Sequence, residues 1–457
     1  MSKSKAQELS ISKYTSHYKH ITRLGVPIML GQLGVIIVGF TDNIMVGHHS
    51  MEELAAASFV NNFFNLASIF GIGFSYGLTP IISGYMARSK YLNAGAMLKN
   101  SLLSNFLIAI GLLIAMGILV LNIDKLGQPK ELIPLIVPYY FLQLASIPFV
   151  MLFNAFKQFN DGMGDTITPM WIMLGTNILN IIGNYFLIFG IAGCPEMGLN
   201  GAGVTTLASR ILALLIFIGL FLLHSKYKEF RIGFKEAFFN RASQGQLFRM
   251  GMPVGIQMGV ESASFSLSVL LMGWIGSVAL AAHQIVGVVT TIGFMIYYGI
   301  GAAVTIRVSL CKGQNDMLGV RRTTFAGLHI MMLLAFIVML IIFACRNYMG
   351  YLFTDNEEVI KMAALLALPV ILYQIGDGLQ ILFANALRGI EDVKFLAYSA
   401  FVCHFGMALP IAYVCGFILD WGALGVWCGF PISLTALGLA LWYRFNTKTK
   451  LIVDPKE

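Results

Sequence analysis

The sequence predicts an all-α polytopic membrane protein with twelve transmembrane helices in two six-helix lobes that are related by an internal repeat. Three observations predict this fold. Of the 457 residues, 57% are hydrophobic and only 11% are charged, which is typical of membrane proteins. Long apolar runs recur along the whole chain, and the second half of the chain repeats the residue spacing of the first half.

Each apolar run is long enough to cross a hydrocarbon core of about 30 Å as a helix, which takes about 20 residues. The polar and basic stretch that precedes the first run has no apolar core, so we expect no cleavable signal peptide. The predicted spans, in order, are 24–46, 55–86, 100–121, 133–156, 168–190, 199–223, 247–275, 280–306, 323–345, 358–386, 395–419 and 422–443.

The basic residues predict the orientation of these spans. If the N-terminus, the C-terminus and alternate loops share one side, that side holds 25 of the 30 lysines and arginines, and Arg210 lies inside a span. Cytoplasmic loops carry an excess of basic residues, so we expect both termini in the cytoplasm. The four basic residues on the other side are Lys125, Lys130, Arg346 and Lys361.

Matching residues in the two halves indicate the internal repeat. Gly25 and Pro27 match Gly251 and Pro253, 226 residues later, and seven further identities follow at the same offset. We therefore expect an N-terminal lobe over 1–223, a cytoplasmic linker loop over 224–248, and a C-terminal lobe with a short basic tail over 249–457. Parallel repeats of this kind usually bind their ligand between the lobes and work by alternating access.

Glu261 is the single charged residue in 250–275. A carboxylate near the middle of a span costs about 2.5–3.5 kcal/mol, so it is expected to face protein or water. Gln257 and Ser264 share its helical face. We interpret this face as a cation site. The alternative is a neutral carboxyl group that links helices by hydrogen bonds.

Asp377 is the only charge in 362–387, again near the middle of a span. Tyr373, Gln374 and Gln380 lie on the same helical face. If Asp377 and Glu261 meet, the two carboxylates can share a proton or bind one desolvated cation. A sodium ion at Glu261 and Asp377 is therefore a candidate.

The first half has a different polar set. Asp42 lies in the first span, and Asn180 and Asn184 share a face of the fifth span, with Asn177. Thr206 adds a hydroxyl group from the sixth span. The amides alone are explained equally well as hydrogen-bonding groups between helices. Together with Asp42, they are predicted to form a second cation or proton site.

The acidic residues inside the spans do not follow the repeat. Glu261 falls opposite Val35, and Asp377 falls opposite Ser146. Carboxylates that only hold a repeated fold together would be expected in both copies, so the mismatch favours a functional division between the lobes and two ion sites. Pro27 and Pro253, by contrast, do match. Each removes one backbone hydrogen bond and is expected to bend its helix, either as a static kink or as a hinge.

Several functions lack their sequence signatures. The six cysteines form no CxxC pair, the eight histidines form no HExxH motif, and there is no GxxxxGK nucleotide loop. The net charge of +8 is accounted for by the basic loops. We therefore expect no enzyme, no resident metal centre or other cofactor, and no nucleic-acid partner.

The sequence resembles the multidrug and toxic compound extrusion (MATE) family, and within it the NorM-like branch. The resemblance covers roughly residues 20–445. It rests on the segments GFTDNIMVG (39–47), GVES (259–262), LAAHQI (280–285), AAVTIRVS (302–309), YQIGDGLQ (373–380) and ALRGIED (386–392).

This resemblance implies a two-lobed antiporter that exchanges Na⁺ or H⁺ for organic cations. It associates the residues matching Glu261, Asp377 and Tyr373 with a cation site in the second lobe. It associates those matching Asp42, Asn180, Asn184 and Thr206 with a site in the first lobe. Some relatives carry Asp in place of Asn184.

The sequence thus predicts a multidrug efflux antiporter in the cytoplasmic membrane, working as a monomer among membrane lipids on organic cation drugs and dyes. The alternative is a flippase for lipids or lipid-linked sugars in the same broad superfamily. A flippase would be expected to place several basic residues among its spans to meet phosphates, whereas only Arg210 lies mid-span.

Overall fold

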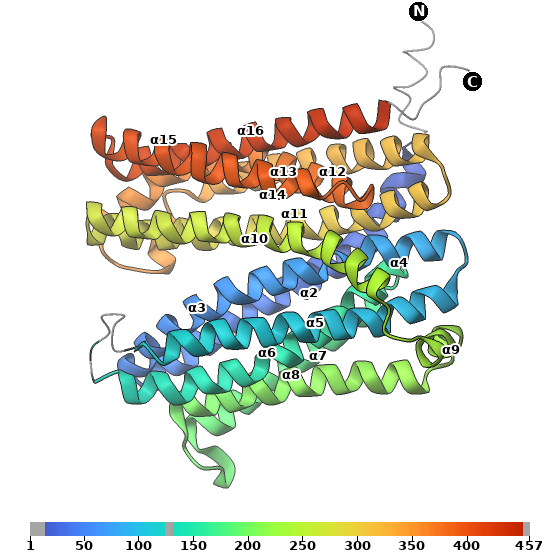
Figure 1. The fold of residues 1–457 in the computed structure, drawn as a ribbon. Coiled ribbons are helices and arrows are strands. Elements are labelled where there is room, and N and C mark those ends of the chain that lie inside the picture. The colour runs from blue at the N-terminus through green and yellow to red at the C-terminus, as the bar shows by residue number, and fades with distance from the viewer. Residues whose placement is uncertain (1–13, 124–128, 130, 451–457) are drawn as a thin grey trace, which may run out of the picture. The chain divides into compact units, whose positions relative to one another are not determined.

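The computed structural model describes residues 14–123, 129 and 131–450 (Figure 1). Within this part of the chain, twelve helical spans are long and apolar enough to cross a membrane, and there are no strands. The predicted fold class is confirmed. The predicted orientation rests partly on basic residues before residue 14, at 125 and 130, and beyond residue 450. These residues lie outside the part of the chain that the structure describes.

The first six spans are formed by seven helices. The second span is divided by a turn at Tyr76 and Gly77. The helices are α2 (Thr15–His49), α3 (Met51–Ser75), α4 (Leu78–Ala87), α5 (Tyr91–Val120), α6 (Ile133–Gly162), α7 (Ile167–Phe189) and α8 (Gly198–Leu223).

The last six spans are also formed by seven helices, but here the eighth span is one continuous helix and the eleventh is divided. The eleventh contains two π-helical turns, η6 (His404–Ala408) and η7 (Val414–Ile418), which apolarity alone does not predict. The helices are α10 (Arg241–Ile275), α11 (Ser277–Gly313), α12 (Met317–Cys345), α13 (Glu357–Gly389), α14 (Lys394–Cys403), α15 (Leu409–Tyr413) and α16 (Gly422–Lys450).

Several helices extend beyond the predicted spans at the ends assigned to the cytoplasm. α2 begins at Thr15, nine residues before the predicted 24, and α11 ends at Gly313, seven after the predicted 306. Apolarity marks only the part of a helix that lies in hydrocarbon. The backbone hydrogen bonds continue into water through polar residues, so the sequence estimate of these ends was too short.

The segment 224–248, predicted as a loop, is largely helical. It contains a short 3₁₀ turn (Ser225–Tyr227), α9 (Lys228–Glu236) and the first residues of α10. The rings of Tyr91 and Phe159 both pack edge-on against Phe230 of α9. The apolar side of α9 therefore has partners on α5 and α6, which explains why this basic segment is ordered as a helix.

The chain forms two units by internal packing. The N-terminal unit is residues 30–259, and the C-terminal unit combines residues 260–450 with the start of α2 up to Met29. Both α2 and α10 therefore contribute to each unit. The lobe limits predicted from the repeat, 223 and 249, stay a prediction.

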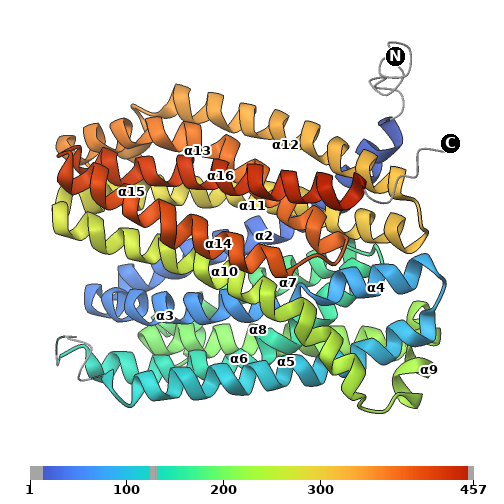
Figure 2. The same ribbon diagram turned by 45° about the horizontal axis from the view of Figure 1, so that its top comes forward.

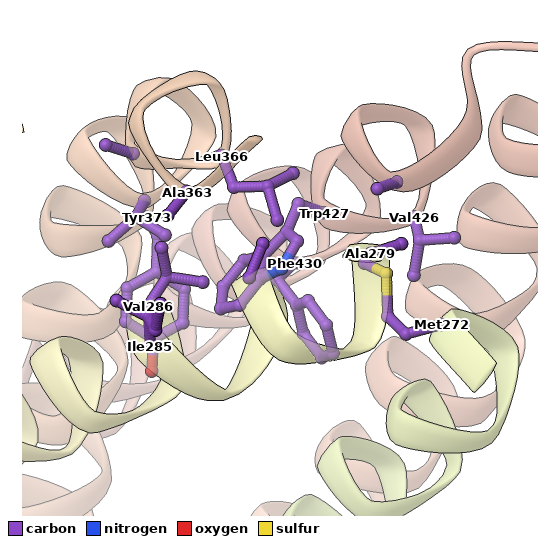
Figure 3. Packing of buried hydrophobic residues seen from close by; sticks show 14 of the residues in the cluster. Met272, Ala279, Ile285, Val286, Ala363, Leu366, Tyr373, Val426, Trp427 and Phe430 are labelled. Atoms are coloured by element: carbon purple, nitrogen blue, oxygen red, sulfur yellow. The ribbon is translucent and has the colours of Figure 1, made fainter. Parts of the chain in front are cut away.

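The core of the C-terminal unit lies among α10, α11, α13 and α16. Figure 3 shows Tyr373, Trp427 and Phe430 within this cluster. α13 and α16 pack side by side along their length, as both ribbon views show (Figures 1 and 2). The N-terminal unit has a corresponding core among α3, α5, α6 and α8.

Glycines allow α13 and α16 to approach closely. A Cβ added at Gly376 of α13 would lie 2.9 Å from the backbone nitrogen of Thr435, and one at Gly438 of α16 would lie 3.1 Å from that of Gln380. We expect Gly376→Ala to destabilise the protein by about 1–3 kcal/mol, because the clash is with backbone and cannot relax by a side-chain rotation.

Thermal unfolding in detergent measures this effect. Gly117→Ala is the matched control, since nothing lies within 4 Å of the added methyl group on α5. Equal melting temperatures for the two variants would contradict the close approach of α13 and α16.

Candidate ion-coupling sites

Glu261 lies on α10 and is half-buried in the C-terminal unit. The Nε2 group of Gln380, on α13, donates a hydrogen bond to Glu261 Oε2 at 3.1 Å. This contact joins the two helices that carry the predicted carboxylates. The position of Gln380 on the face of Asp377 was expected from helical spacing, but its bond to Glu261 required the tertiary structure.

Asp377 is fully buried, and neither carboxylate oxygen has a hydrogen-bond partner in the described part of the chain. Its charge lies within reach of Glu261 and of the Tyr373 hydroxyl, one turn earlier on α13. An ionised carboxylate without partners is costly in an apolar interior. The geometry therefore favours a bound proton or cation at Asp377.

Further oxygen atoms near these acids also lack partners among the described residues. They are Ser264 Oγ, three residues after Glu261 on α10, and Gln380 Oε1. Carboxylate, amide and hydroxyl oxygens are the ligands that hard cations prefer. Glu261 and Ser264 on α10, and Asp377 and Tyr373 on α13, therefore remain the predicted members of one site for Na⁺ or H⁺.

An aromatic cluster fixes the surroundings of Tyr373. Its ring lies edge-on to Phe265 at 6.3 Å and to Trp427 at 6.5 Å, and Phe265 stacks on Phe430 with ring centres 4.5 Å apart. Figure 3 shows Tyr373 in the same cluster as Trp427 and Phe430. Because Tyr373 is packed on several sides, its hydroxyl has a defined position beside Asp377.

Gln257 was predicted from the sequence as part of the C-terminal site, whereas Tyr297 was not. Gln257 is buried one turn before Glu261 on α10, but it belongs to the N-terminal unit, so its part in the site stays a prediction. Tyr297 was missed by sequence reasoning. Its hydroxyl donates to Gln374 Oε1 at 2.9 Å and thereby orients an amide adjacent in sequence to Tyr373. The signal available in the sequence was a tyrosine inside a predicted span, because its hydroxyl group needs a hydrogen-bond partner when it is buried.

The N-terminal unit joins all four of its predicted residues by hydrogen bonds. Asn184 Nδ2 donates to Asp42 Oδ1 at 2.5 Å and to Asn180 Oδ1 at 3.3 Å. Asn180 Nδ2 then donates to Thr206 Oγ1 at 3.3 Å and to Ser209 Oγ at 3.5 Å. Helices α2, α7 and α8 therefore meet through one polar chain, to which Ser209 is an addition that the sequence did not single out.

Neither unit contains a cluster of three or more His, Cys, Asp or Glu side chains with metal-binding geometry among the described residues. A match to a protein-family profile then identifies the family of the chain. The MatE profile matches residues 27–186 and 253–414, one stretch in each half of the repeat. The chain belongs to the MatE family.

Bacterial multidrug resistance proteins are among the curated relatives of this MATE protein. "Multidrug resistance protein NorM" of Photobacterium profundum is 26% identical over 440 residues, which is 95% of this chain and 96% of the relative. "Probable multidrug resistance protein NorM" of Rhizobium meliloti is 29% identical over 445 residues, with 95% and 94% covered.

Solved MATE structures share the fold. The eukaryotic MATE transporter AtDTX14 superposes with a TM-score of 0.87 at 17% identity, covering 96% of this chain and 98% of that one. An outward-facing MATE transporter of the MOP superfamily gives a TM-score of 0.83 at 20% identity, with 95% and 96% covered. The resemblance predicted from sequence is confirmed. This MATE protein is a multi-pass membrane transporter and not an enzyme.

In this MATE protein, the two matching prolines lie inside continuous helices. α2 runs through Pro27 and α10 runs through Pro253. The boundary between the two units falls in the same helices, directly after Met29 and Gly259. Whether the prolines bend these helices statically or as hinges stays a prediction.

Proposed function

We propose that this protein is a secondary active antiporter that exchanges Na⁺ or H⁺ for lipophilic organic cations across the cytoplasmic membrane by alternating access. The observation that carries this proposal is the pair of acids in the C-terminal unit. Asp377 is fully buried, no donor in the described chain reaches its carboxylate with good hydrogen-bond geometry, and it interacts electrostatically with Glu261. The names of the NorM relatives support multidrug resistance as the outcome.

The acids explain how exchange is coupled. An organic cation entering an apolar region loses its hydration, and an opposite charge offsets part of that loss. The same carboxylates attract Na⁺ or H⁺. Either cation can neutralise the site, and an empty charged site is costly. The transporter therefore changes between its inward-facing and outward-facing states only when one of the two cations is bound. We propose Glu261 and Asp377 as the charges of that site, with Tyr373, Ser264 and Gln257 around it.

The first-lobe residues Asp42, Asn180, Asn184 and Thr206 are proposed as a second cation or proton site. Their support is the continuous hydrogen-bonded chain from α2 to α8. Pro27 and Pro253 are proposed as bends that let α2 and α10 change shape, because each lacks one backbone hydrogen bond. In this proposal both termini face the cytoplasm and the transporter acts as a monomer.

Counterflow in proteoliposomes tests the function and its ion. The purified protein is reconstituted with a fluorescent organic cation inside, and an inward Na⁺ gradient or an inward pH gradient is imposed separately. Acceleration by one of these gradients identifies the coupling ion. Transport that responds to neither gradient would contradict secondary antiport.

The charge of the substrate gives a further prediction. Cells that express the protein should tolerate ethidium better than cells that express Glu261→Gln, because the carboxylate offsets the desolvation of the dye cation. Growth across a range of dye concentrations measures the difference, with expression matched by immunoblot. Equal protection against bulky anions would favour the flippase alternative instead.

A further inference from the structure

Arg210 is a charged residue near the middle of α8, and the coupling scheme above does not use it. Its Nη1 group donates to Gln143 Oε1 at 2.9 Å and also to the Ser146 hydroxyl. The guanidinium carbon lies 4.7 Å from the centre of the Phe64 ring. α3 and α6 therefore hold this cation inside the N-terminal unit, away from lipid, where a guanidinium would be strongly disfavoured.

Arg210 lies in the same unit as Asp42. The hydrogen-bonded chain from Asp42 ends at Thr206 and Ser209, in the turn of α8 that carries Arg210, so the two charges lie within electrostatic range although they form no direct ion pair among the described residues. Both charged side chains remain partly exposed.

One other titratable group takes part in these interactions. Tyr139 of α6 interacts electrostatically with both Asp42 and Arg210. Its hydroxyl accepts a hydrogen bond from Gln143 Nε2 at 2.9 Å and donates to Asn61 Oδ1 at 3.2 Å. A tyrosine is neutral near pH 7 because its ordinary pKa is about 10. Among the described residues that interact with Asp42, Arg210 is therefore the one that can balance its charge.

The internal repeat shows that this balance is particular to the first half. At an offset of 231 residues, Gln143 matches Gln374 and Ser146 matches Asp377. Gln374 Oε1 accepts from the neutral Tyr297, whereas Gln143 Oε1 accepts from Arg210. At the position where the second half has Asp377, the first half has Ser146. The Ser146 hydroxyl accepts a hydrogen bond from Arg210. Helix packing alone does not require an acid at one of these matching positions and a hydroxyl group that is hydrogen-bonded to a base at the other.

We propose that Arg210 is a tethered counter-cation that neutralises Asp42 and so sets the charge preference of the N-terminal lobe. A transported cation that approaches Asp42 competes with Arg210 and meets its repulsion. The lobe therefore binds mobile cations weakly, although it contains a carboxylate. The pairing of Arg210 with Asp42 does not depend on the protein being an antiporter. Its consequence for ion coupling rests on the proposed function.

Two ions of nearly equal size and opposite charge test this role. Tetraphenylphosphonium and tetraphenylborate binding is measured on purified protein in nanodiscs, in a Glu261→Gln/Asp377→Asn background that removes the acids of the C-terminal unit. Both ions also partition into the bilayer. Comparing the variants at the same lipid concentration removes this contribution from the difference in binding. No ion gradient is used, so a protein that fails in counterflow still gives a result here.

We expect Arg210→Gln to tighten tetraphenylphosphonium binding about tenfold and to weaken tetraphenylborate binding, because Asp42 is left unopposed. Arg210→Lys keeps the charge and should bind both ions like its parent. A change of the same sign for both ions, or equal effects of Gln and Lys, would indicate a purely structural Arg210 and overturn the proposal.

Asp42→Asn in the otherwise unchanged protein gives an independent measurement if Arg210→Gln fails to fold. This nearly isosteric change leaves Arg210 unopposed, so tetraphenylborate binding should tighten. Unchanged tetraphenylborate binding in a well-folded Asp42→Asn protein would show that Asp42 and Arg210 do not balance each other.

Discussion

Glu261→Gln and Asp377→Asn are each expected to abolish ion-coupled efflux while the protein still folds. Both substitutions are nearly isosteric and remove a charge that is costly to bury. Glu261 accepts a hydrogen bond from Gln380, and an amide oxygen at the same place can accept it too. The expected loss therefore concerns the charge that a transported cation needs.

Ethidium efflux driven by the coupling ion in proteoliposomes measures this effect. Glu358→Gln is the matched control, because this residue is an exposed acid in the first turn of α13, the helix that carries Asp377. Asp42→Asn is expected to impair efflux as well, since it leaves Arg210 without a counter-charge. Wild-type efflux by a well-folded Glu261→Gln or Asp377→Asn protein would refute the assignment of coupling to these acids.

The sequence alone favoured two ion sites. With Arg210 opposing a second ion at Asp42, we instead expect efflux of a monovalent drug by the wild-type protein to be indifferent to the membrane potential. The two acids of the C-terminal unit exchange one monovalent cation for another, and Arg210 already balances Asp42. No net charge then crosses the membrane in a cycle. If a second ion entered at the N-terminal site, one charge per cycle would move, and 100 mV would supply about 2.3 kcal/mol, or a roughly 50-fold drug gradient.

The measurement compares drug gradients at a fixed ion gradient, with the potential held by valinomycin either at zero or inside-negative. The Glu261→Gln protein reports passive leak of the drug at each potential. A leak-corrected end point that increases with the inside-negative potential would mean that two ions enter per drug. In that case the N-terminal site takes up an ion in spite of Arg210.

Helix number was predictable because apolarity is a local property of each segment. The runs around Glu261 and Asp377 are long enough to span the membrane whichever neighbours they have. Helix ends such as Thr15 and Gly313 were not predictable in this way, since the polar residues there neither end the helix nor favour hydrocarbon. α9 was missed as well, because it is ordered by Phe230 packing against α5 and α6.

Helical spacing also placed polar side chains on common faces. It put Asn180 with Asn184, and Tyr373 with Asp377. It did not pair residues across helices, because spacing within one helix carries no information about its neighbours. The bonds from Gln380 to Glu261 and from Asn184 to Asp42 join segments 119 and 142 residues apart.

The sequence by itself determined a twelve-helix MATE-type membrane protein with isolated acids in its spans, since hydrocarbon requires long apolar helices and makes each buried charge conspicuous. The tertiary structure alone decided which partner each charge has. No donor in the described chain reaches Asp377 with good hydrogen-bond geometry. Arg210, in contrast, is held by Gln143 and Ser146, in the turn of α8 that hydrogen bonds link to Asp42. The physical reason is that electrostatic energy depends on distance in space, which helix packing sets.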